Sequence, residues 1–91
     1  MMLTPVYTKQ FEKDIKRVKK RGKNLEKFKI VAHTLLERKP IDLIHRDHKL
    51  IGRYRGRREC HIEADWLLIY KKASDRIIFE RTGTHSDLFK K

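Results

Sequence analysis

The sequence predicts an α+β fold in which two N-terminal helices pack on one face of an antiparallel-rich sheet. Two segments in the first half repeat apolar residues at helical spacing, and three later segments alternate apolar and polar residues as strands do. Short turns separate the later segments, so neighbouring strands should run antiparallel. One sheet with both helices on one face buries both apolar stripes. Residues 1–91 are therefore expected to form a single domain whose other sheet face is open.

The beginning of the chain predicts a short strand followed by a helix. Residues 3–8 are rich in β-branched and aromatic side chains, and Pro5 suits an edge strand better than a central one. Thr8 is a suitable N-cap for the helix, and Gly22 is well placed to end it. The helix carries a narrow apolar stripe at i, i+4 and i+7, formed by Phe11, Ile15 and Val18.

A second helix is predicted between Asn24, which can cap its start, and Pro40, which stops it. Because the link around Gly22 is short, the two helices should form an antiparallel hairpin. The apolar positions of the second helix follow the i, i+3, i+4 pattern and comprise Leu25, Phe28, Val31, Ala32, Leu35 and Leu36.

The second half begins with a basic loop and continues with three strands. Residues 41–58 contain two glycines and many basic side chains without a helical stripe, so we expect a loop with a short strand at residues 50–54. The tail after residue 82 is long enough for one helical turn. The three strands are predicted at Arg58–Ala64, Trp66–Lys72 and Arg76–Thr82, with a turn at residues 73–75.

The composition predicts a basic surface around a thin core. Hydrophobic residues make up 38% of the chain and charged residues 40%, and 24 Lys and Arg outnumber 12 Asp and Glu to give a net charge of +12. A domain this basic favours nucleic acid as a partner, because each neutralised phosphate releases condensed counterions. Charge alone does not distinguish binding from cleavage.

The compartment is predicted from what the sequence lacks. The single cysteine, Cys60, excludes an internal disulfide and fits a reducing cytosol. The first residues lack the apolar segment of a signal peptide, and no apolar run approaches the roughly 20 residues needed to cross a membrane. We therefore expect a cytoplasmic protein with no membrane association.

The segment ECHIEADWLLIY, residues 59–70, predicts a β-hairpin that gathers polar side chains around its turn. If alternation directs Cys60 toward the helices, His61 lies on the open face. Directly opposed residues in a hairpin are about 5 Å apart at Cβ. A turn at residues 63–65 would then bring His61, Asp65 and Trp66 into one patch.

The third predicted strand adds residues that suit metal-independent RNA cleavage. Arg81 and His85 could reach the same patch, and Phe89 supplies a second aromatic ring. In such a reaction a base takes the 2′-OH proton, an acid protonates the departing 5′-oxygen, and a cation stabilises the phosphorane. Histidine suits both proton transfers, and aromatic rings can stack on a base. No CxxC, HxxxH or HExxH spacing is present, so no metal or other cofactor is expected.

The strings DHKLIGRYRGRRECHIEADWLLIY and FERTGTHSDLF resemble the YafQ branch of the RelE/ParE toxin superfamily. The similarity runs from Asp47 through Phe89 and rests on the spaced patterns DH-x-L-x-G, R-x2-H-x3-DW, L-x2-Y and RTG-x-H-x3-F. Before Asp47 the layout of a short strand and two basic helices agrees, with less specific motifs. The resemblance implies a RelE-like, microbial RNase-type fold.

The resemblance also implies a function and a set of site residues. Such toxins are ribosome-dependent endoribonucleases that cut translated mRNA. They need no metal. The positions matching the family's catalytic residues are His48, His61, Asp65 and His85, with Arg81 as the phosphate-stabilising cation. The candidate substrate-binding residues are Trp66, Phe89, Lys49 and Arg57. We favour His85 as the general acid and Asp65 or His61 as the base.

The implied partners are an acidic antitoxin similar to RelB or DinJ, together with the ribosome and its mRNA. Operator DNA would be contacted only through the antitoxin. Two other functions remain open: a ParE-like toxin that inhibits DNA gyrase, and a non-catalytic RNA- or ribosome-binding module. The histidines and aspartate argue against the first, because an inhibitor needs no groups for proton transfer.

Overall fold

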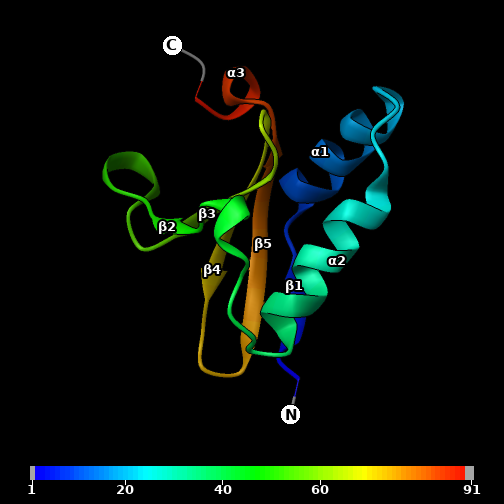
Figure 1. Ribbon diagram of the computed structural model, residues 1–91. Helices are drawn as coiled ribbons and strands as arrows, with labels where there is room; N and C mark the ends of the chain where they lie inside the picture. The colour runs from blue at the N-terminus through cyan, green and yellow to red at the C-terminus, as the bar shows by residue number, and fades with distance from the viewer. Residues whose placement is uncertain (1, 90–91) are drawn as a thin grey trace.

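The computed structural model describes residues 2–89, in which two helices cover one face of a five-stranded sheet (Figure 1). The strand order is β1-β5-β4-β3-β2. Neighbouring strands are antiparallel except for β1, which runs parallel to β5. The predicted α+β fold is confirmed, with a sheet that is mixed because of β1. The strands are β1 (Thr4–Tyr7), β2 (His48–Lys49), β3 (Arg58–Glu63), β4 (Trp66–Lys72) and β5 (Arg76–Gly83).

The two long helices begin where the sequence predicts. The Thr8 side chain accepts a hydrogen bond from the backbone N of Phe11 and so caps α1 (Lys9–Lys20). Asn24 caps α2 (Leu25–Leu36) in the same way. The helix α2 ends at Leu36, before Pro40, because Arg38 adopts a left-handed backbone conformation (φ 62°).

The main core lies between these helices and the sheet. Figure 1 shows α1 and α2 on one side of the sheet, with α1 leading away from β1 and α2 returning. The rings of Phe11 and Phe28 lie 5.4 Å apart, and both contact Phe79 of β5. Cys60 is fully buried in this core, as alternation predicts. Each buried aromatic side chain contributes a few kcal/mol of hydrophobic stabilisation.

The second sheet face is not open, contrary to the sequence-based expectation. A small apolar cluster on this face consists of Leu67, Ile69 and Leu88, with Leu50 and Tyr54 packed against it. Leu88 belongs to α3 (His85–Leu88), the predicted single helical turn. The cluster therefore holds both α3 and the basic loop against the sheet.

The strand predicted at residues 50–54 is wrong. Pairing with β3 stops at Lys49, and a short 3₁₀ helix (Gly52–Tyr54) follows. Gly52 has φ +68°, which interrupts an extended strand and lets the loop direct Tyr54 over the second cluster. In the part of the chain described, residues 2–89, no helix combines the length and apolarity needed to cross a membrane.

Candidate functional site

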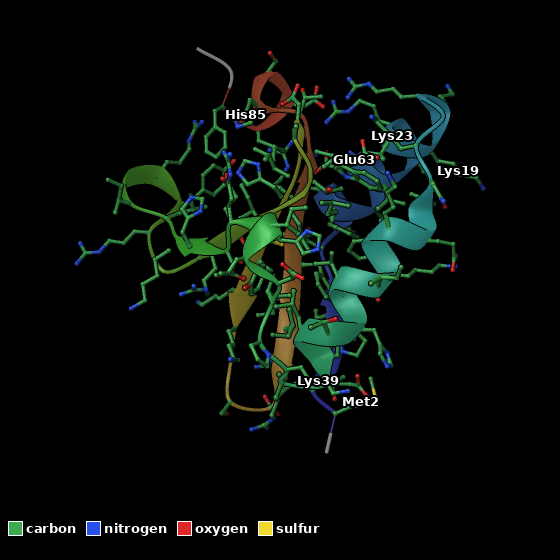
Figure 2. The ribbon with its side chains drawn as sticks, in the orientation of Figure 1. Met2, Lys19, Lys23, Lys39, Glu63 and His85 are labelled. Atoms are coloured by element: carbon green, nitrogen blue, oxygen red, sulfur yellow. The ribbon has the colours of Figure 1, made fainter. Side chains whose placement is uncertain are left out.

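His85 is held by Asp65 through two hydrogen bonds. His85 lies at the start of α3, where β5 ends (Figure 2), and Asp65 lies in the turn between β3 and β4. Oδ1 of Asp65 accepts from the His85 backbone N at 2.8 Å and from His85 Nδ1 at 2.5 Å. These two bonds hold the pKa of Asp65 below its ordinary value. Because Nδ1 donates to the carboxylate, Nε2 of His85 is the ring atom available to a substrate.

Glu59 lies between the imidazoles of His48 and His61. It is 5% exposed, and its Oε1 is 3.4 Å from His48 Nε2 and 3.5 Å from His61 Nε2. The other oxygen, Oε2, is buried and has no hydrogen-bond partner within residues 2–89. Nδ1 of His48 donates to the backbone O of Arg46 at 2.7 Å. The buried Glu59 carboxylate thus faces one ring nitrogen of each imidazole.

His61 is the central imidazole of a row of three. Its ring centroid lies 5.7 Å from that of His85 and 6.5 Å from that of His48. Nδ1 of His45 donates to the backbone O of His61 at 2.7 Å and so fixes this part of β3. The structure thus brings together four predicted site residues, His48, His61, Asp65 and His85.

The turn that carries Asp65 is tied to the helical layer. Figure 2 shows Glu63 directed toward Lys23, and Lys23 Nζ and Lys27 Nζ each donate to its carboxylate at 2.7 Å. These contacts hold the pKa of Glu63 below its ordinary value. A cavity of about 360 Å³ adjoins this end of β3. Its lining includes Ile44, His45, Arg46, His61, Glu63 and Ala64.

The α3 turn is anchored to α1 through Asp87. Nη1 and Nη2 of Arg21 donate to the two oxygens of Asp87 at 2.6 and 3.1 Å, which holds the pKa of Asp87 well below its ordinary value. Asp87 also accepts from the backbone N of Thr84 in a capping box. At Gly83 (φ +152°) an added Cβ would lie 2.7 Å from Asp87 Oδ2, so only glycine fits this approach. These contacts fix the position of His85.

The prediction that Trp66 lies in a patch with His61 and Asp65, where it could bind the substrate, is wrong, because its ring points into the core. The side chain is 2% exposed, and its Nε1–H donates to Thr82 Oγ1 at 2.9 Å. β4 begins at Trp66, and its alternating residues Trp66, Leu68 and Tyr70 lie in the core beneath the helices. Trp66 therefore supports β4 and β5 from within the core and cannot stack on a base in this arrangement.

Arg81 lies on the face of the sheet that carries the histidines, but on β5, two strands away from Glu59 on β3. Arg81 pairs with Ile69, which in turn pairs with Glu59. Two strand spacings separate Arg81 from Glu59 at the backbone, about 10 Å. Nε of Arg81 donates to Oδ2 of the buried Asp14 at 2.7 Å, and this contact raises the pKa of Arg81.

The other predicted substrate-binding residues differ in their exposure. Phe89 is 39% exposed and stacks edge-on against Tyr54, with ring centroids 5.7 Å apart. Lys49 is exposed on β2, whereas Arg57 is half-buried and donates through Nε to Glu80 at 3.0 Å. The side chains of Phe89 and Lys49 are thus exposed, whereas that of Arg57 is already paired with Glu80.

The sequence-based search missed Glu59, Tyr54 and Asp14. Alternation places Glu59 on the same face as His61, so the sequence could have indicated its position. Alternation does not predict that Glu59 is buried. Asp14 looks like one more charged residue on a charged helix, and Tyr54 like part of a strand. Their roles depend on long-range contacts that local patterns do not encode.

The arrangement is suited to acid–base chemistry. The imidazole of His85 is oriented by the ionised carboxylate of Asp65. The imidazoles of His61 and His48 both face the buried carboxylate of Glu59. Within residues 2–89, no three His, Cys, Asp or Glu side chains form a group that could hold a metal ion. Burial of Cys60 raises the pKa of its thiol, so this sulfur is not a nucleophile of the site.

Fold and site together define a small, basic α+β protein with histidines and carboxylates arranged for proton transfer. The sequence profile of a family described as "Bacterial toxin of type II toxin-antitoxin system, YafQ" matches residues 3–90. The chain belongs to this YafQ family of type II toxins. The family resemblance and the RelE-like fold predicted from the motifs are confirmed.

Individual relatives agree with this assignment over nearly their whole length. The mRNA interferase toxin YafQ of Escherichia coli (strain K12) is 42% identical over 84 residues, which cover 91% of each chain. YafQ in the crystal structure of the E. coli DinJ–YafQ toxin–antitoxin complex is 39% identical, with a TM-score of 0.90 and coverage of 98% and 99%. A metal-bound toxin from Helicobacter pylori is 36% identical, with a TM-score of 0.91 and coverage of 97% and 100%.

Proposed function

We propose that the protein is an endoribonuclease that cleaves mRNA on translating ribosomes and thereby inhibits translation. The observation that carries this proposal is the Asp65-held imidazole of His85, which lies 5.7 Å from the imidazole of His61. Two ionisable rings at this separation can flank one phosphodiester and act on its two sides. The E. coli relative is an mRNA interferase toxin, which supports this substrate class.

The proposed reaction uses His61 as the base and His85 as the acid. His61 takes the proton of a ribose 2′-OH, and the resulting oxygen attacks the adjacent phosphorus. The bond from phosphorus to the 5′-oxygen breaks as His85 donates its Nε2 proton to that oxygen, which leaves a 2′,3′-cyclic phosphate and a 5′-OH. Asp65 is less suited to the role of base, because its Oδ1 already accepts two bonds from His85.

The remaining site residues would bind and polarise the substrate. Glu59 can receive the proton that His61 takes, through the 3.5 Å contact between their side chains. Phe89 is exposed enough to stack on a base, and Lys49 can contact a phosphate. Arg81 would stabilise the charge that develops on the phosphorane.

An acidic antitoxin is the proposed protein partner, because a net charge of +12 repels itself unless an acidic surface covers it. The E. coli relative was crystallised with the antitoxin DinJ, which supports a cognate antitoxin here. We propose that operator DNA is contacted only through that antitoxin. We propose that the protein acts in the cytoplasm, where it would meet translating ribosomes.

The test is an assay of mRNA cleavage on translating ribosomes with the purified protein. Wild type should cut the mRNA, and His85→Ala should cut about 10²–10⁴-fold more slowly. His33→Ala is the matched control, because His33 is exposed on α2, on the far side of the sheet from α3 (Figure 1). Intact mRNA with wild type, together with inhibition of DNA gyrase, would refute the proposal in favour of a ParE-like activity.

Metal dependence is tested in the same assay. A chelator selective for transition metals, which leaves Mg²⁺ for the ribosome, should not change the rate, because the proposed steps use only imidazole and carboxylate groups. Loss of cleavage with the chelator and recovery with added metal would contradict the proposed mechanism. The metal-bound H. pylori relative makes this control necessary.

A further inference from the structure

The acidic side chain of Asp14, on the opposite helical layer, reaches the sheet residue Arg81. Asp14 is 1% exposed, and its two oxygens accept from Arg81 Nε at 2.7 Å and Arg81 Nη2 at 3.3 Å. It also accepts from Gln10 Nε2 and Arg17 Nη2, both at 3.1 Å. Asp14 is therefore held from both sides and cannot change rotamer without breaking several contacts.

The topology explains why an α1 carboxylate reaches β5. β1 ends at Tyr7, whereas β5 continues to Gly83, so within the described part of the chain the last part of β5 has no neighbouring strand on that side. Asp14 Oδ2 accepts from the backbone N of Thr82 at 3.1 Å at this strand edge. Arg81 is adjacent in sequence and meets the same carboxylate.

Asp14 engages one edge of the Arg81 guanidinium, and the side chain of Tyr54 also lies near the group and helps to raise its pKa. Asp14 binds it side-on, through one N–H of Nε and one of Nη2. The opposite edge, formed by Nη1 and the second N–H of Nη2, has the fork geometry that fits two oxygens of a phosphate. The side chain of Arg81 is 22% exposed, so an anion can approach it.

We propose that Asp14 is a positioning residue that orients Arg81 so that the edge formed by Nη1 and Nη2 meets the scissile phosphate. The inference rests on the proposed function, because it assigns Arg81 a substrate phosphate. An unrestrained arginine would lose side-chain rotamer entropy on ordering at the transition state. Asp14 imposes that order before the substrate arrives, which favours kcat over KM.

The negative charge of Asp14 opposes the benefit of positioning Arg81, so the two effects predict opposite changes in the cleavage rate of Asp14→Asn. A carboxylate beside Arg81 weakens the positive field that reaches the phosphate. If charge dominated, Asp14→Asn would cleave faster than wild type. If positioning dominates, as we propose, the same variant cleaves more slowly.

The experiment is a double-mutant cycle on ribosome-bound mRNA with wild type, Asp14→Asn, Arg81→Ala and the double variant. Asp14→Asn should lower kcat roughly tenfold with KM within about twofold of wild type. In the Arg81→Ala background it should cost no further activity, because the group that it positions is gone. Glu12→Gln, an exposed charge change on the same helix, is the matched control.

Arg81→Lys separates geometry from charge. Lysine keeps the positive charge but has one nitrogen, which cannot bind Asp14 and a phosphate along two separate edges. It should lose as much kcat as Asp14→Asn, and wild-type activity would overturn the inference. Thermal unfolding of each variant gives the folded fraction, so rates are compared per folded molecule.

The other outcomes also decide the question. An equal loss on Asp14→Asn in both backgrounds would assign Asp14 a purely structural role at the edge of β5, and an increased rate would assign it an electrostatic one. Full activity of Arg81→Ala would show that Arg81 does not act on the phosphate. That result would overturn the role of Asp14 but not the endoribonuclease activity. No cleavage by wild type would overturn both.

Discussion

Asp65 uses one carboxylate oxygen to accept hydrogen bonds from both the backbone N and Nδ1 of His85. The first bond fixes the start of α3, and the second fixes the plane of the imidazole. A lowered pKa keeps Asp65 ionised at neutral pH, so it stabilises the protonated ring. The pair therefore links the β3–β4 turn to the C-terminal helix and prepares His85 to donate a proton.

Asp65→Asn should slow mRNA cleavage by about 10–10³-fold. The amide oxygen can still accept the backbone bond, but the uncharged side chain no longer provides the charge-assisted bond that orients the imidazole. Steady-state cleavage of ribosome-bound mRNA measures the loss. Cleavage at the wild-type rate would show that the charge of Asp65 is not needed.

Glu59→Gln should separate stability from activity. Among the described residues 2–89, one oxygen of this buried carboxylate has no hydrogen-bond partner, and removing its charge relieves an unfavourable burial. We expect a free energy of unfolding that is unchanged or up to about 1 kcal/mol higher in urea titrations. Cleavage should nevertheless fall at least tenfold, because His61 loses its carboxylate partner. Wild-type cleavage by this variant would exclude Glu59 from the reaction.

The two predicted stacking aromatics should behave differently when mutated. Trp66→Phe removes the bond to Thr82 and should lower the free energy of unfolding by about 1–2 kcal/mol, with cleavage per folded molecule near wild type.

Phe89→Ala should leave stability nearly unchanged and raise KM, because the exposed ring would stack on a base. Thermal unfolding and steady-state cleavage of both variants test this distinction. A large rise in KM for Trp66→Phe would show that the indole contacts RNA after a rearrangement.

The contrast between Trp66 and His61 shows what the sequence can predict. Alternation along β3 correctly places Cys60 inward and His61 outward, because that strand is long and regular. The same reasoning fails at Trp66, since the bulge between His61 and Glu63 and the tight turn reset which face each residue occupies. Helix caps, the approximate bounds of β3, β4 and β5 and the single turn of α3 were predictable from local residue preferences, whereas those of β2 were not.

What could not be predicted depends on contacts distant in the chain. Asp14 and Arg81 are 67 residues apart in sequence, and Arg21 and Asp87 are 66 apart. No periodicity identifies such pairs among 24 basic and 12 acidic residues. The second apolar cluster is similar, because its members come from β4, α3 and a loop without regular spacing.

Acid should loosen α3 through Asp87. The pKa of this carboxyl is lowered by Arg21, so the ion pair contributes stability above the ordinary aspartate pKa of about 3.9. That contribution is lost as the pH falls from there through the lowered value in the folded protein. Asp87→Asn keeps an acceptor for the cap but loses the charge, and it should cost about 1 kcal/mol at neutral pH, because Arg21 is partly exposed.

The measurement is the free energy of unfolding of wild type and Asp87→Asn between pH 7 and pH 2.5. Their difference should be constant down to about pH 4.5 and shrink below it, because wild type then takes up the proton that the variant never binds. Asp75→Asn is the control, since its carboxylate is 79% exposed, and its difference from wild type should stay near zero. A difference for Asp87→Asn that persists to pH 2.5 would mean that the carboxylate stabilises α3 through shape and hydrogen bonding alone.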